Sequence, residues 1–214
     1  GSDLGATSCD GFPEVVVYVS PKFGAEFVGD DALALLEGVR CIEGSVAIRE
    51  VSSLQPLQEL RIVTGSLSVT DSDLTTLVPL ASLTAAYRLE LNRLDGLGDL
   101  DGLENLRAVD LLYIGRSSLS VLIEEVPEEG NDGLTDMSAL AGLEVSDTLK
   151  LGNNAALASL EGLPSVAPRY VEITLNSALP VAEVLAYQAK LSDTDELLHC
   201  GNLGDEPCEL LPPS

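Results

Sequence analysis

Leucine recurs at every third position in five blocks along the middle of the chain. A period of three fits neither an α-helix nor a β-strand, but it is typical of 3₁₀ or polyproline-like segments. We therefore predict that each block runs along a core with one apolar edge facing inward. The ladder residues are Leu54, Leu57, Leu60; Leu74, Leu77, Leu80, Leu83; Leu97, Leu100, Leu103, Leu106; Leu134, Met137, Leu140, Leu143; and Leu157, Leu160, Leu163, Val166.

A short strand with alternating apolar and polar positions accompanies each block. Its first apolar residue lies six positions after the last ladder residue in three repeats, for example Leu89 after Leu83. Each unit is thus predicted to be one coil of strand, turn, ladder segment and turn. A single coil cannot bury its own apolar edge, so the coils should stack as parallel strands. The predicted inward pairs are Val46 and Ile48, Leu67 and Val69, Leu89 and Leu91, Leu112 and Ile114, Leu149 and Leu151, and Ile173 and Leu175.

The expected architecture is one mainly β solenoid domain over residues 3–211. Gly1 and Ser2 resemble the remnant of a removed tag and are left out. The first leucines of consecutive blocks are 23 residues apart in two cases, from Leu74 to Leu97 and from Leu134 to Leu157. From Leu97 to Leu134 the spacing is 37 residues, which places an insertion at about 116–133. The parts are an N-terminal cap 3–44, coils 45–176 and a C-terminal cap 177–211. The N-terminal cap is predicted to contain a strand over Val15–Val19 and a helix over Ala32–Leu36, with Asp30 or Asp31 as N-cap. The C-terminal cap is predicted to contain a helix over Val181–Leu191.

The outward positions of the strands form two files across the predicted sheet. Leu111 and Tyr113 fall in mid-sheet with charged residues around them, which is the composition of a recognition patch. The alternative is that the insertion folds over both. The files are Ser45, Ser66, Arg88, Leu111, Thr148, Glu172 and Ala47, Ser68, Glu90, Tyr113, Lys150, Thr174; the candidate binding residues are Arg88, Glu90, Leu111, Tyr113, Lys150 and Glu172.

Asparagines follow several of the predicted strands, at Asn92, Asn153, Asn154 and Asn176. Asparagine suits a tight corner, because it tolerates the left-handed conformation and its side chain bonds to the backbone. A role as ligand contacts is the alternative.

Charge excludes two classes of partner. The chain carries 35 acidic and 11 basic residues, a net charge of −24. Neither nucleic acid nor an anionic membrane surface suits such a surface, because both are bound by clustered Lys and Arg. No apolar run is long enough to span a membrane, so we expect no direct membrane insertion of the domain.

The four cysteines form one pair near each end of the chain. This placement favours disulfides Cys9–Cys41 and Cys200–Cys208 over a metal site, which would need closer cysteine pairs or several histidines. Disulfides indicate an oxidising compartment: extracellular, cell surface or periplasmic.

The motif Leu97…Leu100-Asp101-Gly102-Leu103-Glu104-Asn105-Leu106 returns as Leu157…Leu160-Glu161-Gly162-Leu163. With these repeats the chain resembles the receptor L-domain group, related to leucine-rich repeats, and is similar to bacterial cell-surface proteins and lipoproteins of this type. The segments Cys41–Ile48 and Cys200–Cys208 resemble the family's first full coil and its closing loop. The resemblance implies a short right-handed parallel β-helix, and a lipid anchor on the full-length form is compatible with it. It implies little about function, and the insertion departs from a plain array.

No catalytic constellation emerges from the sequence. The single histidine, His199, lies beside Cys200, and no nucleotide-binding glycine motif is present. We expect a non-enzymatic module without a cofactor that binds a protein or glycan at the cell surface. A structural envelope component and a carboxylate-based carbohydrate-active enzyme are the alternatives. The acidic residues of the insertion are a weak candidate site for Ca²⁺: Glu124, Glu125, Glu128, Glu129 and Asp132.

Overall fold

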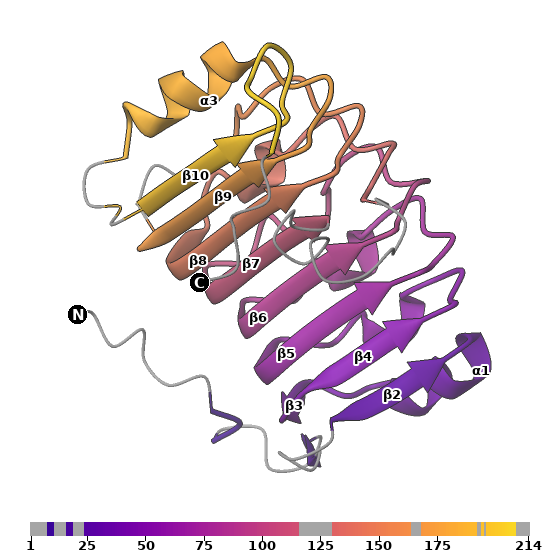
Figure 1. Ribbon diagram of the computed structural model, residues 1–214. Helices are drawn as coiled ribbons and strands as arrows, with labels where there is room; N and C mark the ends of the chain where they lie inside the picture. The colour runs from indigo at the N-terminus through magenta and orange to yellow at the C-terminus, as the bar shows by residue number, and fades with distance from the viewer. Residues whose placement is uncertain are drawn as a thin grey trace, which may run out of the picture.

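The protein is mainly β, with a ten-stranded sheet in the part of the chain that the structure describes. This structure is a computed structural model, and it describes residues 8–10, 16–18, 24–115, 130–163, 168–191, 194 and 196–208. Every strand pair in the sheet is parallel, and the strands succeed one another in chain order from β5 to β10 (Figure 1). The strands are β1 Val16–Tyr18, β2 Ala25–Val28, β3 Cys41–Glu43, β4 Val46–Arg49, β5 Ile62–Thr70, β6 Ala85–Asn92, β7 Ala108–Gly115, β8 Glu144–Gly152, β9 Tyr170–Thr174 and β10 Glu196–Cys200.

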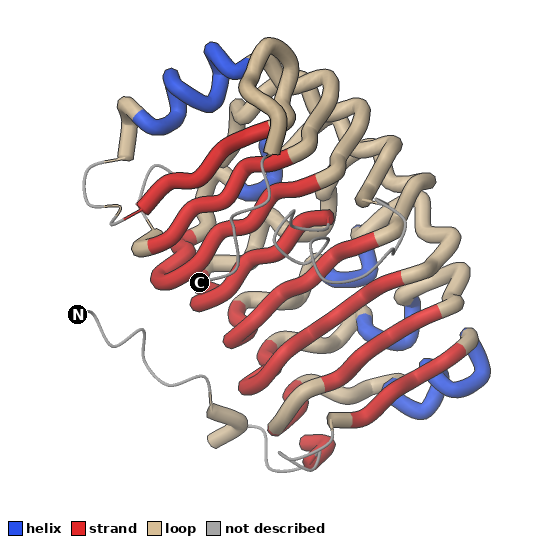
Figure 2. Tube along the Cα trace, in the orientation of Figure 1, coloured by secondary structure: helices blue, strands red, loops and turns tan. Residues whose placement is uncertain are grey.

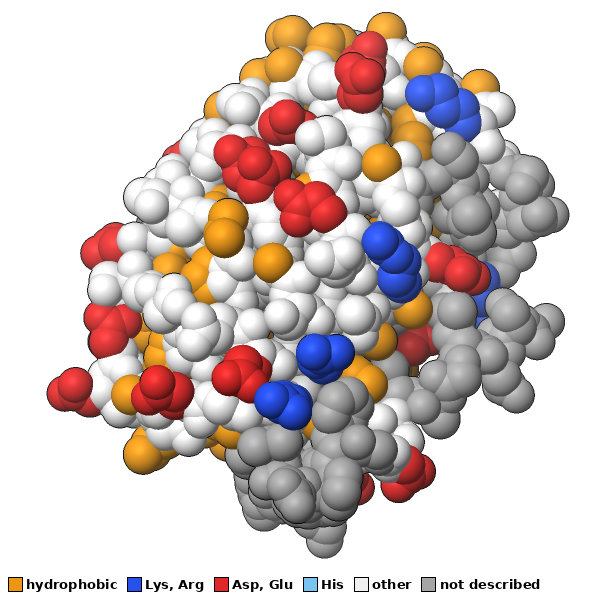
Figure 3. Space-filling model, turned by 180° about the vertical axis from the view of Figure 1, so that it is seen from behind, with side chains coloured by type: hydrophobic (Ala, Val, Ile, Leu, Met, Phe, Trp, Pro, Cys, Tyr) orange, Lys and Arg blue, Asp and Glu red, His pale blue; other side chains and the backbone are white. Residues whose placement is uncertain are grey.

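The segments that connect successive strands return along one side of the sheet, so that the core lies between them and the strands (Figure 2). The leucine ladder occupies these segments, and every ladder residue that the structure describes is buried. Three of the segments contain a 3₁₀ turn, as the three-residue period predicts: η2 Gln55–Leu57, η3 Val78–Leu80 and η4 Ser138–Leu140. Figure 3 shows this ladder side from outside, with acidic side chains scattered over it.

The strands in the middle of the sheet begin earlier than the sequence predicts. Strand β6 starts at Ala85 and β7 at Ala108, three residues before the alternating segments chosen from the sequence. A register shift between Val63 and Ser66 in β5 interrupts the alternation. A strictly alternating pattern breaks off at such an irregularity, because the extra residue reverses which side of the strand faces the core.

Small helices lie at both ends of the stack. The predicted N-terminal helix is present as α1 Asp30–Leu33 followed by η1 Ala34–Leu36. The predicted N-cap is wrong, because Gly29 precedes the helix and no side chain caps it. The Asp30 carboxylate instead accepts bonds from the backbone N and the Oγ of Ser52, at 2.8 and 2.6 Å. At the other end, α3 Val181–Gln188 is shorter than predicted.

A polar row runs through the corner that follows the strands. Asn131, Asn154, Asn176 and Asn202 are buried there, and each amide bonds to the next across neighbouring coils at 3.1 to 3.2 Å. Asn153 adopts a left-handed conformation with φ of 57°. The corner interpretation of Asn153, Asn154 and Asn176 is thereby confirmed, whereas Asn92 is the last residue of strand β6 and pairs with Thr70.

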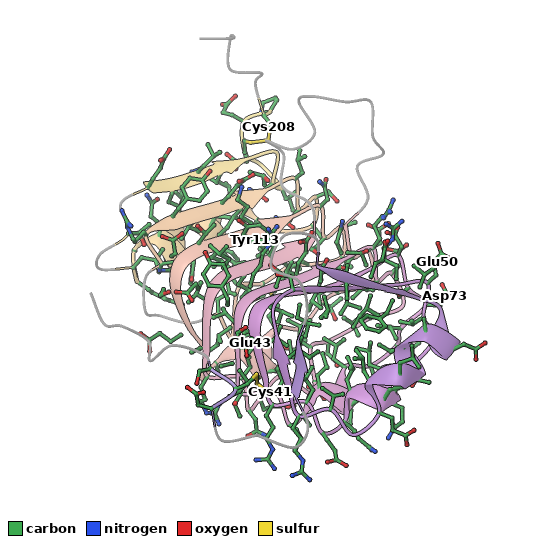
Figure 4. The ribbon with its side chains drawn as sticks, turned by 90° about the horizontal axis from the view of Figure 1, so that it is seen from below. Cys41, Glu43, Glu50, Asp73, Tyr113 and Cys208 are labelled. Carbon is green, nitrogen blue, oxygen red and sulfur yellow. A yellow bond between two sulfur atoms is a disulfide. The ribbon has the colours of Figure 1, made fainter. Side chains whose placement is uncertain are left out.

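Two disulfides join Cys9 to Cys41 and Cys200 to Cys208, as predicted. Cys41 and Cys208 lie near opposite ends of the stack, with Tyr113 between them (Figure 4). Among the described residues, no helix is long and apolar enough to cross a membrane.

Candidate functional site

The outward face of the central strands carries the candidate site, with Tyr113 of β7 in the middle. The parallel register places Tyr113 between Glu90 of β6 and Lys150 of β8. Arg88 lies opposite Leu111 in the neighbouring file. Because equivalent residues of paired strands are about 4.8 Å apart, these side chains form one continuous surface.

Tyr113 is flanked by two cations. The guanidinium carbon of Arg88 lies 4.2 Å from the centre of the Tyr113 ring, and the Lys150 ammonium lies 5.6 Å from it. At these distances both cations are attracted to the electron-rich face of the ring. A carboxylate holds each cation in addition: Arg88 pairs with Glu90 and Lys150 with Glu172, both at 3.1 Å. The ring is therefore part of an ordered polar network.

Glu172 is the most buried charged group of this network. Its side chain has no exposed surface, although it belongs to the outward face of β9. Burying a carboxylate costs free energy unless it is paired with an opposite charge and hydrogen-bonded. Lys150 supplies the charge, and the Tyr170 hydroxyl lies 3.4 Å from Glu172 Oε2, at the long end of hydrogen-bonding range. These contacts fix Lys150 in front of Tyr113.

The predicted file was wrong at the last coil. The alternating pattern predicts Glu172 beside Thr148 and Thr174 beside Lys150, whereas the structure pairs Tyr170 with Thr148 and Glu172 with Lys150. The inward residues of β9 are accordingly Val171 and Ile173, aligned with Leu149 and Leu151. The error came from treating Leu175 as a strand residue, but Leu175 turns the corner with φ of 59°.

Tyr170 is a site residue that the sequence analysis missed. The centre of its ring lies 5.6 Å from the Lys150 ammonium, so Lys150 lies within cation–π distance of both Tyr113 and Tyr170. Burial, followed by the negative charges of Glu172 and Glu196, raises the pKa of Tyr170 to about 12. The hydroxyl thus stays protonated at neutral pH. The alternation Tyr170-Val171-Glu172-Ile173 is the signal in the sequence that places Tyr170 at the site, because Tyr170 and Glu172 share one face of the strand.

Leu111 and Tyr113 are half-buried on this face. Whether the insertion covers them depends on residues 116–129, which lie outside the described residues, as do four of the calcium candidates, Glu124, Glu125, Glu128 and Glu129. The fifth, Asp132, is exposed, and its backbone N lies 3.4 Å from Asp95 Oδ1. Within the described part of the chain, no three metal-binding side chains come together.

A shallow hollow of about 600 Å³ lies on the ladder side, between the last two leucine blocks. Two carboxylates, Asp136 and Glu161, line it. Asp136 accepts a hydrogen bond of 2.7 Å from the backbone N of Ser138, and the backbone and side chain of Ser138 lower the pKa of Asp136 below its usual value. A lowered pKa does not suit Asp136 to the part of the proton donor in a glycosidase, which must hold its proton near neutral pH.

His199 is engaged in the closing loop. Its Nδ1 lies 2.7 Å from Asp205 Oδ2, and the same carboxylate accepts a bond from Asn202 Nδ2 at 3.1 Å. These bonds tie the loop closed by Cys200 and Cys208 to the buried asparagine row.

Comparison of the chain with protein-family models, with curated proteins and with solved structures finds no match.

Proposed function

We propose that this protein is a non-enzymatic recognition module, secreted or held at a cell surface, which binds a protein or glycan through the outward face of its sheet. In this proposal the repeated coils form a right-handed β-solenoid of the receptor L-domain type. The observation that carries the binding role is the aromatic ring of Tyr113, placed between Arg88 and Lys150 in mid-sheet.

The arrangement favours binding because its side chains are already ordered. The carboxylates of Glu90 and Glu172 hold the two cations in place, so little side-chain entropy is lost when a partner arrives. Aromatic and arginine side chains at the centre of a surface are the residue types that contribute most to recognition. The half-buried Leu111 adds apolar area beside them.

Charge balance on this face argues against the carbohydrate-active enzyme. Catalytic carboxylates act as a pair with one proton donor and one base or nucleophile. Here Glu90 and Glu172 are each neutralised by a cation. The two disulfides support an oxidising, extracellular location.

The test compares capture of partners by the wild-type protein and by Tyr113→Ala. Both proteins are immobilised and exposed to native cell-surface extract and to a glycan array, and bound species are quantified. Tyr113→Ala should lose most of the binding, because the ring and the position of both flanking cations are lost together. Lys150→Ala should weaken the same species.

Tyr87→Ala is the matched control, because Tyr87 is exposed on the same sheet but has no cation over its ring among the described residues. It should bind as the wild type does. Equal binding by Tyr113→Ala and wild type would reject the sheet face as the site. No retention of any species by the wild type would favour the structural envelope role.

A further inference from the structure

Three arginines lie in one file at the corner that precedes the strands. The backbone N of Arg61 bonds to the O of Arg40, that of Thr84 to the O of Arg61, and that of Arg107 to the O of Thr84, at 2.8 to 2.9 Å. Four successive coils therefore contribute Arg40, Arg61, Thr84 and Arg107 to a straight row. With coils about 4.8 Å apart, the row is roughly 14 Å long.

Among the described residues, two of these arginines have no acidic partner. Arg40 pairs with Glu59 at 3.1 Å, but within the described residues neither Arg61 nor Arg107 forms an ion pair with a carboxylate. Both side chains are exposed. In a protein with 35 acidic and 11 basic residues, two exposed arginines in one row that pair with no described carboxylate are unexpected.

Arg107 is held in a defined position. Its Nη1 donates to the backbone O of Glu104 at 2.5 Å and lies over Gly142 of the following coil, where an added Cβ would be 3.1 Å away. Within the described part of the chain, its other guanidinium donors meet no carboxylate. Figure 3 shows that basic side chains gather along one edge of the ladder side, whereas acidic ones are spread over it.

We propose that this arginine file (Arg40, Arg61, Thr84 and Arg107) binds a linear anionic glycan that carries carboxylate or sulfate groups along its length. Guanidinium groups recognise such planar or tetrahedral anions through paired charged hydrogen bonds. The site is separate from the Tyr113 face and does not depend on it.

A glycan fits this file better than the other polyanions. Nucleic acid has a denser charge, which the net charge of −24 repels and which so few cations cannot neutralise. A folded acidic protein would need a larger surface with apolar anchors. The surroundings of the arginines are polar instead: the Thr84 hydroxyl within the file and the Asn105 amide beside it suit sugar hydroxyl groups, and Glu144 ends the row after Arg107.

Binding of the full chain is measured by calorimetry with four probes: oligogalacturonate, dextran sulfate, neutral dextran and a polyglutamate peptide. The wild type should bind at least one of the two anionic glycans and not neutral dextran, and added salt should weaken the binding. The double variant Arg61→Ala/Arg107→Ala should bind about tenfold more weakly, since two charged contacts are lost. The double variant Arg61→Lys/Arg107→Lys should bind more tightly than the double alanine variant and more weakly than the wild type.

Arg49→Ala is the control for a change in charge, because Arg49 lies off the file and pairs with Glu26 at 3.1 Å. It should bind as the wild type does, and so should Tyr113→Ala, which separates this site from the sheet-face proposal. The proposal is overturned if neither anionic glycan binds, if Arg49→Ala weakens binding as much as the double variant, or if polyglutamate binds as tightly as the glycans.

Discussion

Buried amides are the most constrained polar groups of this protein. Asn176 accepts from the backbone N of Asn154 and donates to the backbone O of Leu151 and of Thr174. The same side chain also contacts the amides of Asn154 and Asn202. One residue thus satisfies polar groups of three coils, in a place from which water is excluded.

Asn176→Ala should lower the free energy of unfolding by about 3 kcal/mol, because several buried polar groups would lose their partner at once. Urea unfolding followed by circular dichroism measures the change. Ser177→Ala is the control, since Ser177 is exposed and should change stability by less than about 0.5 kcal/mol. Similar losses in both variants would show that the asparagine row carries no special role.

The Asp205 carboxylate makes stability depend on acid pH. Burial acts to raise its pKa, but bonds from His199, Asn202 and the backbone N of Glu206 prevail and lower it. The folded pKa therefore lies below the unfolded value of about 3.9. Its contribution is complete above that value and is lost as the pH falls through the folded pKa.

Asp205→Asn should accordingly cost about 1 kcal/mol at pH 7 and progressively less below pH of about 4, because the wild-type carboxyl becomes neutral there too. Chemical unfolding of both proteins across this pH range measures the difference. A gap that stays constant down to the lowest pH would contradict the assignment of the effect to this carboxylate.

At the scale of one coil, the glycine of the repeated motif has a steric cause. Gly102 adopts φ of 112° and Gly162 φ of 92°, which L-residues with a side chain rarely adopt. A Cβ on Gly102 would lie 2.1 Å from the backbone O of Leu77, and one on Gly162 would lie 2.5 Å from Cα of Ser138. The glycine therefore lets these two ladder segments pack directly on the coil before them.

Gly102→Ala should destabilise the protein by about 3 kcal/mol or more, because strain in the backbone adds to a clash with backbone atoms. Gly98→Ala is the matched control within the same ladder segment, since an added Cβ there meets nothing within 4 Å. Thermal and urea unfolding of the two variants should give clearly different losses. Equal stability would disprove the close-packing explanation.

The coil was predictable because its apolar pattern is regular. Leucines three apart mark the ladder, and pairs such as Leu89 and Leu91 mark the strand, so both were found from the sequence. Strand β10 was not, because Glu196–Cys200 follows no leucine block. The corner at Leu175 was also missed, since leucine does not signal a left-handed conformation.

The candidate site was predictable only in part, for the same reason. Register between regular coils placed Arg88, Glu90, Leu111 and Tyr113 correctly relative to one another. The pairing of Lys150 with Glu172 required the true register of β9, which depends on a corner that the pattern does not show. The arginine file depends on the turns before the strands, where no alternation guides the alignment.

For the molecule as a whole, self-repulsion opposes folding. The chain carries a net charge of −24. Three ion pairs of the described residues, Arg40–Glu59, Arg49–Glu26 and Arg169–Asp147, are exposed on both sides and are therefore weak. Raising NaCl from about 0.01 to about 1 M shortens the screening length from roughly 30 to 3 Å.

The melting temperature should therefore rise by about 5 °C over this range of salt, as repulsion between acidic side chains is screened. Differential scanning calorimetry measures the melting temperature. A second series with glucose in place of NaCl, at matched osmolality, controls for the effect of solute exclusion. A melting temperature that falls with salt would mean that the ion pairs outweigh the repulsion.

The break in the leucine ladder has a consequence for how such a chain can change. The described part of one coil ends at Gly115, which pairs with Gly152, and the next described residue is Gly130, whose O accepts a bond from the N of Arg93. Coils on both sides keep their parallel partners. The number of stacked coils, and not the number of residues, therefore sets the length of the core. New sequence can be inserted after the end of a strand, as after Gly115, without altering that core.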